Sequence, residues 1–336
     1  MGTRDPMEHR GVESGIDVAC FGELLWDFYE AESKGDGKEP IARQFRRELG
    51  GASANVAVTL ARLGVKSAAI GGVGNDKLGA AIESALTAEG VDVEHVVRLA
   101  APTGITFVTH SATGDASFIP YRGGTADQKL GEGDITAAMG KAPFTLVSST
   151  SMMASTRAAT EKLLAAVEKA KGTLIVDLNV RAHLWPDSDE MRSATKALVA
   201  RAALVKGSER DFNALAGKRG MSWLEENAKQ ATWILTRGEN GAAAVGAHGQ
   251  ATAPTKRVRC IDRSGGGDAF VAGLLAVLVK AGAKPGGAEW KDAKLWTRAL
   301  EVGHLLGAKA VAALGATTGL TRLDDVKSRL SASKKG

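Results

Sequence analysis

Three consecutive glycines stand directly before an aspartate in the segment DRSGGGDAFVAGLL, which covers residues 262–275. Glycine has no Cβ, so the backbone N–H groups of Gly265, Gly266 and Gly267 can approach a ligand closely. The apolar run after them has the character of a helix, and the N-terminus of a helix carries a partial positive charge. Together these features predict an anion site suited to phosphate.

Asp268, at the end of the glycine run, allows two interpretations. A free Asp has a pKa of about 3.9, so this carboxylate would be ionised at pH 7 and could take a proton from a hydroxyl that attacks phosphorus. The alternative is an N-cap, because Asp is a favoured residue at the start of a helix. The motif alone leaves both interpretations open.

The segments around this motif alternate between helix and strand patterns. Val56, Leu60 and Leu63 recur at helical spacing in GGASANVAVTLARLG, and Gly64 is a good helix end. Short apolar runs such as SAAIGGVG, FTLVSST, TLIVDLNV and ALVKGS are typical of strands, and DVACFGELLWDF is the first strand candidate. This alternation predicts one α/β domain with a largely parallel sheet. The segment TGITFVTHSATGDASFIPYR breaks the pattern and predicts a hairpin around a Thr-Gly-Asp turn.

Composition excludes several classes of function. The chain has 336 residues, 44% hydrophobic and 24% charged, as in ordinary globular proteins. Its net charge of +5 is scattered, and aromatic residues amount to 5% without alternating with Lys or Arg, which argues against nucleic-acid binding. We find no apolar run that could cross a bilayer, so no membrane partner is expected. Two cysteines, Cys20 and Cys260, form neither a disulfide framework nor a zinc spacing, and they favour a reduced, cytoplasmic compartment.

Several segments together resemble a known family. DRSGGGDAFVAGLL resembles the C-terminal signature of the PfkB (ribokinase-like) carbohydrate kinases, usually D-T-x-G-A-G-D-x-F, and GGASANVAVTLARLG followed by GGVGNDKLG resembles their N-terminal signature. DLNVRAHLW, VKGSERDF, LTRGENGA and LGATTGL follow in the family order. The resemblance implies a ribokinase-like three-layer α/β/α domain over residues 16–325, with a mostly parallel central sheet. Segments near 28–48 and 100–124 would form a small β-sheet lid. A polar leader, residues 1–15, would precede the domain, and a basic tail, residues 326–336, would follow it.

The resemblance also assigns roles around the reacting groups. Asp268 matches the catalytic base, and Gly265, Gly266 and Gly267 match the anion hole. The residues that match sugar contacts are Asp27, Gly51, Ala52, Asn55, Arg122, Asn179 and Arg181. Structural alternatives stay open for three of these positions: an ordinary strand-end Asp at Asp27, a helix-start cap at Asn55, and a buried pair between Asp177 and Arg181.

For the nucleotide, the family pattern matches Ser208, Thr236, Gly238, Gly241 and His304. Asp211 matches the acidic residue that organises Mg²⁺ and the ATP phosphates through water, although Asp is one carbon shorter than the usual Glu. Two positions depart from the signature: Arg263 replaces a small Thr, and Gly266 replaces Ala. Arg263 either folds back onto the β- or γ-phosphate of ATP, or it points to solvent or pairs with a surface carboxylate.

The function implied by the resemblance is ATP-dependent phosphorylation of a primary hydroxyl on a small sugar, with fructose as the first choice. A kinase of 2-keto-3-deoxygluconate is the alternative, because such enzymes share a Tyr-Arg like that of Tyr121 and Arg122. A non-catalytic sugar- or nucleotide-sensing protein on the same scaffold is a third hypothesis, and the intact Asp268 argues against it. ATP and Mg²⁺ are the expected cofactors, with K⁺ as a further candidate. In relatives the lid often mediates dimerisation, so the resemblance points to a homodimer through the lid.

Overall fold

A nine-stranded sheet forms the centre of the computed structural model, which describes residues 15–31, 42–110, 116–219, 222–223, 226, 231–321 and 323–331. The strand order is β13-β12-β11-β10-β9-β8-β1-β4-β5, and all neighbours from β11 to β5 are parallel, whereas β12 and β13 are antiparallel. The strands are β1 Val18–Phe21, β4 Ser67–Gly74, β5 Val96–Leu99, β8 Phe144–Ser148, β9 Thr173–Asp177, β10 Leu204–Ser208, β11 Thr232–Thr236, β12 Ala242–Gly246 and β13 Gly249–Ala253. The predicted, mostly parallel central sheet is therefore confirmed.

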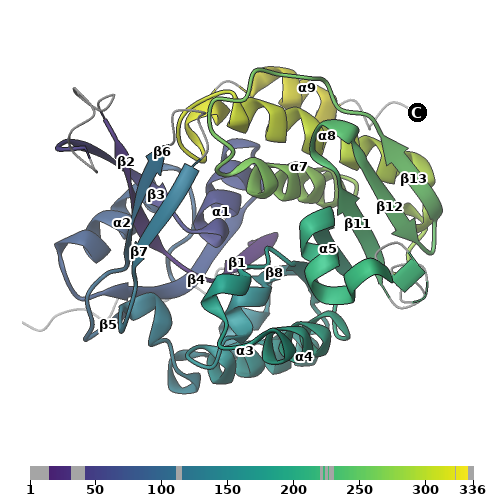
Figure 1. Cartoon of the computed structure of the whole chain (residues 1–336). Coiled ribbons are helices and arrows are strands. Elements are labelled where there is room, and N and C mark those ends of the chain that lie inside the picture. The colour runs from purple at the N-terminus through teal and green to yellow at the C-terminus, as the bar shows by residue number, and fades with distance from the viewer. Residues whose placement is uncertain are drawn as a thin grey trace, which may run out of the picture.

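Helices cover both faces of this sheet (Figure 1). In β1, Val18 and Cys20 pack into one core, while Ala19 and Phe21 pack into the other, because successive residues of a strand face opposite sides. The first core includes α1 Ala52–Arg62, α2 Lys77–Ala88, α7 Gly266–Lys280, α8 Ala293–Val311 and α9 Asp324–Ser331. The second core includes α3 Arg157–Lys169, α4 Ser188–Val199 and α5 Glu209–Ala216. The result is the predicted three-layer α/β/α arrangement.

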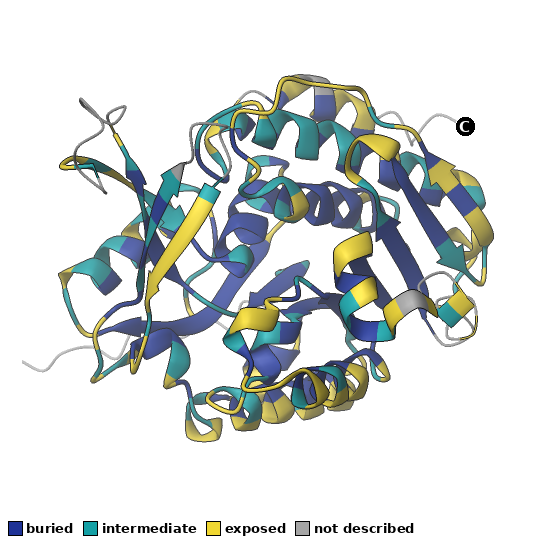
Figure 2. Cartoon of the chain, in the orientation of Figure 1, coloured by how far each residue is buried: buried dark blue, intermediate teal, exposed yellow. Residues whose placement is uncertain are grey.

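A second sheet of four strands forms the predicted lid beside the central sheet, in the order β3-β2-β6-β7. Its strands are β2 Leu25–Glu30, β3 Phe45–Gly50, β6 Ile105–His110 and β7 Ala116–Tyr121. Phe107 packs against the rings of Phe28, Phe45 and Tyr121, with centroids 5.5, 4.9 and 5.7 Å apart. The outer strand β7 is largely exposed (Figure 2). The antiparallel pairing of β6 with β7 confirms the hairpin, whose Thr-Gly-Asp turn lies outside the described residues.

One prediction about the extent of a strand is wrong. The segment DVACFGELLWDF is two strands in two different sheets, because the chain turns at residues 22–24 between β1 and β2. Residues 326–331, the first part of the segment predicted as a basic tail, belong to α9, whose Val326 and Leu330 lie one helical turn apart and are both buried.

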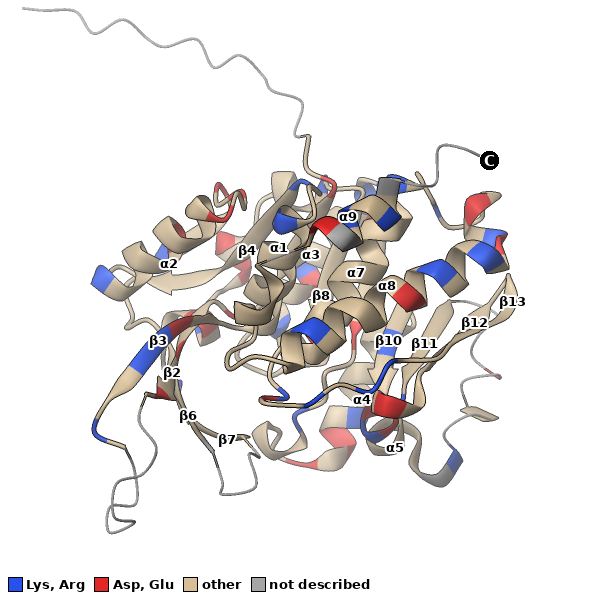
Figure 3. Ribbon diagram, turned by 90° about the horizontal axis from the view of Figure 1, so that it is seen from above, with Lys and Arg blue, Asp and Glu red and all other residues tan. Residues whose placement is uncertain are grey.

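Lys and Arg are spread over many helices and strands in Figure 3, in line with the scattered net charge. Within the described part of the chain, no helix is long and apolar enough to cross a membrane.

Candidate active site

The glycine run forms a tight turn that leads into α7. Gly265 is the residue before the helix and has a φ of 71°, in the left-handed region that favours glycine. A Cβ at this position would lie 2.4 Å from the carbonyl oxygen of Ala316, so only glycine fits. Buried Asp262 fixes the turn, because its carboxylate accepts hydrogen bonds of 2.9 Å from the backbone N–H groups of Ser264 and Gly315. The start of α7 is thus held with its free N–H groups at a cavity wall.

Asp268 lies in the first turn of α7 and caps no helix, because the cap position is Gly265 and no side chain caps this helix. Its Oδ2 atom instead accepts a hydrogen bond of 2.8 Å from Asn55 Nδ2 on α1. Asn55 is not the cap of α1 either, since that position is Gly51. Burial raises the pKa of Asp268, while the Asn55 hydrogen bond and the positive charges of Lys206 and Arg181 oppose this shift. The capping alternatives for Asp268 and Asn55 are therefore wrong.

A cavity of ≈ 430 Å³ opens in front of Asp268. Its walls come from the lid sheet, from α1, from the ends of β9 and β10, and from the glycine turn. The structure brings together in these walls every residue predicted for the sugar, namely Asp27, Gly51, Ala52, Asn55, Arg122, Asn179 and Arg181. Asn179 has a φ of 37°, a conformation that Asn tolerates better than most residues.

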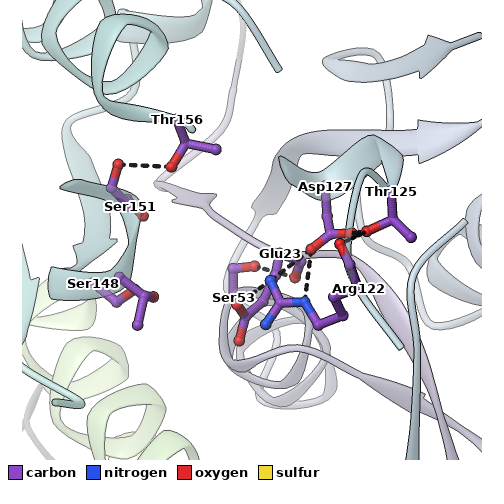
Figure 4. Close-up of polar contacts among 9 residues, drawn as sticks. Glu23, Ser53, Arg122, Thr125, Asp127, Ser148, Ser151 and Thr156 are labelled. Carbon is purple, nitrogen blue, oxygen red and sulfur yellow. Dashed lines mark hydrogen bonds and ion pairs between the residues drawn. The ribbon is translucent and has the colours of Figure 1, made fainter. Parts of the chain in front are cut away.

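Carboxylates and cations both line this cavity. Asp27 is 8% exposed, and burial and the neighbouring Glu23 raise its pKa to about 7, against the opposing charge of Arg122. Asp27 lies within β2 of the lid sheet, not at the end of the first strand. The guanidinium of Arg122 contacts Glu23 at 2.8 Å and Asp127 at 2.5 Å (Figure 4). The positive charge of Arg122 is thus matched by two carboxylates of the protein itself.

The pair proposed between Asp177 and Arg181 is not found. Asp177 contacts Lys206 instead, with Lys206 Nζ 3.0 Å from Oδ1 and 3.2 Å from Oδ2. Both residues are buried in the parallel sheet, whereas Arg181 is exposed at the rim of the cavity. Arg181 is therefore available to a ligand in the cavity.

A second cavity, of ≈ 610 Å³, lies on the other side of the glycine turn. Its walls include Thr236, Gly238 and His304 of the predicted nucleotide residues, and His304 packs edge-on against Phe270 at 5.1 Å. Gly241 is not among the wall residues, but its carbonyl accepts a 2.8 Å hydrogen bond from the Arg237 N–H and so closes the turn that carries Gly238.

Ser208 and Asp211 also lie outside the walls of both cavities and pair with each other. Ser208 donates from its backbone N–H and from Oγ to Asp211 Oδ2, at 2.8 and 2.7 Å. Asp211 Oδ1 accepts a 2.8 Å hydrogen bond from the Val180 N–H. These contacts fix the junction of β10 and α5, and the nucleotide and magnesium roles of the pair stay predictions.

No group of three or more His, Cys, Asp or Glu residues suited to a metal ion occurs in the part of the chain that is described. Mg²⁺ commonly reaches such sites bound to nucleotide phosphates, with few direct protein ligands.

The two cavities meet at the glycine turn. Gly267 and Arg263 belong to the walls of both, while Gly265 and Asp268 face the first cavity and Gly266 faces the second. A hydroxyl bound in one cavity and a phosphate bound in the other would therefore come together beside Asp268.

Sequence reasoning missed several wall residues of the first cavity. Glu23 lies in the short connection between β1 and β2, and Thr106 and Phe118 belong to the lid sheet. Lys206 is a charged residue inside the apolar run ALVKGS, and that contrast was the available signal. Nothing in the sequence pattern pointed to Thr106 or Phe118, because their place depends on how the lid sheet closes.

Comparison with known proteins places this arrangement in a family. The model of the pfkB family carbohydrate kinases matches residues 16–322. Fructokinase-2 of Solanum lycopersicum is 30% identical over 283 residues, which cover 81% of this chain and 85% of that protein.

Solved structures are similar over nearly the whole chain. The fructokinase of Vibrio cholerae O395 with fructose, ADP and calcium ion is 27% identical, with a TM-score of 0.78 and coverage of 95% of this chain and 100% of that one. A double mutant of that enzyme contains fructose, ADP and potassium ion, with the same identity and TM-score and with coverage of 94% and 98%. Aminoimidazole riboside kinase of Salmonella enterica, with aminoimidazole riboside and an ATP analogue, is 26% identical, with a TM-score of 0.76 and coverage of 94% and 99%. The chain belongs to the pfkB family of carbohydrate kinases and is a phosphotransferase with a ribokinase-like fold.

Proposed function

We propose that this protein transfers the γ-phosphoryl group of ATP to a primary hydroxyl of fructose. The observation that carries this proposal is the position of Asp268 beside a helix N-terminus, where the two cavities meet. Asp268 Oδ2 is held by Asn55, which leaves Oδ1 to accept the proton of a sugar hydroxyl. The oxygen then attacks phosphorus, the bond between phosphorus and ADP breaks, and the N–H groups of the glycine turn take up charge on the phosphoryl oxygens.

The lid-side wall of the sugar cavity favours a neutral sugar, whereas Arg181, Arg210 and Arg263 line its other side. Asp27, Glu23 and Asp268 face the cavity, and the one buried cation near them on the lid side, Arg122, is already paired with Glu23 and Asp127. Carboxylates accept hydrogen bonds from sugar hydroxyls, but they repel a substrate carboxylate. On the lid side this supports fructose over 2-keto-3-deoxygluconate, and Arg181 on the other side is the cation that a substrate carboxylate would contact.

The lid would complete the site around the sugar. Thr106, Phe118 and Pro120 of the lid sheet line the sugar cavity, so closure of this sheet would exclude water and limit ATP hydrolysis. Exposed Ile119 and Tyr121 on β7 are 40% and 61% accessible, and they offer an apolar edge for a homodimer. Mg²⁺ would arrive with ATP and meet Asp211 through water, and K⁺ remains a candidate on the strength of the relative that binds it.

A substrate panel tests the proposal. Purified protein is given Mg·ATP with fructose, 2-keto-3-deoxygluconate, ribose or aminoimidazole riboside, and ADP release and sugar phosphate are both measured. We expect fructose to give the highest kcat/KM. A higher kcat/KM with 2-keto-3-deoxygluconate would reassign Arg181 to carboxylate binding, and ADP release without any sugar phosphate would contradict the proposed function.

A further inference from the structure

A lysine lies buried in the central sheet near the reacting groups. Lys206 is the only charged residue of β10, and 5% of its surface is exposed. It stands opposite Asp177 of β9 in the strand register, and the two side chains form a buried ion pair. Burying two charges costs desolvation that their attraction often fails to offset, so such a pair is weak evidence for a stabilising role.

The position of the lysine indicates what the pair is for. Lys206 lines the sugar cavity. A Cβ placed on Gly267 would lie 3.1 Å from Lys206 Nζ, so the ammonium group is next to the glycine turn. Gly267 belongs to the walls of both cavities, and Lys206 therefore presents its charge where sugar and nucleotide would meet. The other cations in these walls near the turn, Arg181, Arg210 and Arg263, are exposed.

We propose that Lys206 is a further catalytic residue, which binds an oxygen of the phosphoryl group during transfer, and that Asp177 is a positioning residue that holds it there. An ammonium group has three N–H donors. Asp177 occupies two of them at most, and the third is open to a phosphoryl oxygen. The inference rests on the proposed role of Asp268 and the glycine turn.

The lysine keeps its proton throughout the reaction. Burial lowers its pKa, but the carboxylates of Asp177, Asp211 and Asp268 outweigh this and raise the pKa above its usual value. The proton of the sugar hydroxyl goes to Asp268, a new oxygen–phosphorus bond forms, and ADP leaves. Lys206 contributes a fixed positive charge that becomes more useful as charge spreads over the phosphoryl oxygens.

Substitutions separate this role from a purely structural pair. Lys206→Met removes the charge but leaves Asp177 unpaired in the sheet, so loss of activity could come from misfolding. The double variant Lys206→Met/Asp177→Asn removes both charges and keeps the shapes similar. Lys280→Met is the matched control, because Lys280 is a surface lysine that bonds the Gly64 carbonyl at 2.8 Å, away from both cavities.

We expect the folded double variant to lose about 10²–10³-fold in kcat, the usual effect of removing one donor to developing charge. Lys280→Met should keep wild-type kcat. If the pair only joins β9 to β10, the double variant will fold and retain kcat within a few-fold of wild type, and the inference is overturned. Asp268→Asn is measured alongside: an unimpaired Asp268→Asn enzyme would refute the proposed function itself, whereas an impaired Asp268→Asn enzyme with an active double variant would refute only the role of Lys206.

A binding measurement gives a readout that does not depend on turnover. ADP with aluminium fluoride mimics the phosphoryl group in transit, and its binding is followed as a rise in melting temperature with fructose present. We expect ADP alone to stabilise wild type and double variant equally, and aluminium fluoride to add a further rise only in wild type. An equal further rise in both proteins would contradict contact between Lys206 and the phosphoryl group.

Discussion

Replacing Asp27 by asparagine should make the protein more stable and a poorer sugar kinase. Asp27 is 8% exposed, and burial together with Glu23 raises its pKa from 3.8 to about 7. The folded protein therefore resists ionisation of this carboxyl, whereas the unfolded chain ionises it freely. Stability from this group is fully present below pH 3.8 and is lost as the pH rises to about 7. Asparagine has a similar shape and never ionises.

The size of the effect follows from the pKa difference. About three pKa units, at about 1.4 kcal/mol each, make ionised Asp27 cost the folded protein about 4 kcal/mol at pH 8. A chain of 336 residues has an unfolding entropy of about 0.7 kcal/mol/K, so relief of this cost corresponds to about 6 °C in melting temperature. At pH 5 the carboxyl is protonated in the folded protein, and the pH is only about one unit above the unfolded pKa of 3.8. The free-energy cost to the folded protein is then less than half of its value at pH 8, so the gain in melting temperature should shrink in proportion.

The assay is thermal unfolding of wild type and Asp27→Asn at pH 8 and pH 5, with and without fructose. We expect the variant to melt higher than wild type at pH 8, mainly in the absence of sugar. The KM for fructose should rise, because each lost hydrogen-bond partner in a closed site costs about 1–3 kcal/mol, while the KM for ATP stays nearly constant. A variant that melts lower than wild type at both pH values would refute the burial argument, and equal effects on both KM values would make Asp27 structural.

Three further variants probe other parts of the account. Arg263→Thr restores the usual family residue at a position that lines both cavities. If Arg263 contacts an ATP phosphate, the variant should have a several-fold higher KM for ATP, and the increase should be larger at low Mg²⁺. Unchanged ATP kinetics would show that Arg263 does not contact the nucleotide. Arg122→Gln removes the ion-pair partner of buried Asp127 and should lower the free energy of unfolding by about 3–5 kcal/mol in a urea titration. A stable variant whose only defect is weaker binding of acidic sugars would instead support 2-keto-3-deoxygluconate as substrate. Ile119→Ser with Tyr121→Ser should turn a lid-mediated dimer into a monomer in light scattering, and a dimer of unchanged mass would place the interface elsewhere.

Local patterns were enough to predict the glycine turn, the following helix and the strand–helix alternation. The glycine run and the apolar helix after it depend on residues near one another in sequence, and the structure has them as expected. The junction between β1 and β2 was missed because DVACFGELLWDF is apolar on both sides of Gly22, so no change of periodicity marks the turn.

The contacts that define the chemistry were less accessible from the sequence. Asn55 and Asp268 are 213 residues apart, and their hydrogen bond depends on the packing of α1 against α7. Lys206 and Asp177 meet through the register of two parallel strands, which the pattern of apolar residues does not fix. The capping interpretations of Asn55 and Asp268 were each sensible from the sequence, but the helices begin at other residues, with Gly51 and Gly265 at the cap positions.

The most direct test of the account is the turnover of Asp268→Asn with saturating Mg·ATP and fructose. Asparagine has nearly the same shape as aspartate, so ADP and fructose should raise the melting temperature of the variant as much as that of wild type. In contrast, kcat should fall by about 10²–10⁴-fold, the usual contribution of a general base. A variant that binds both ligands normally and keeps more than half of the wild-type kcat would contradict the assignment of Asp268 as the base.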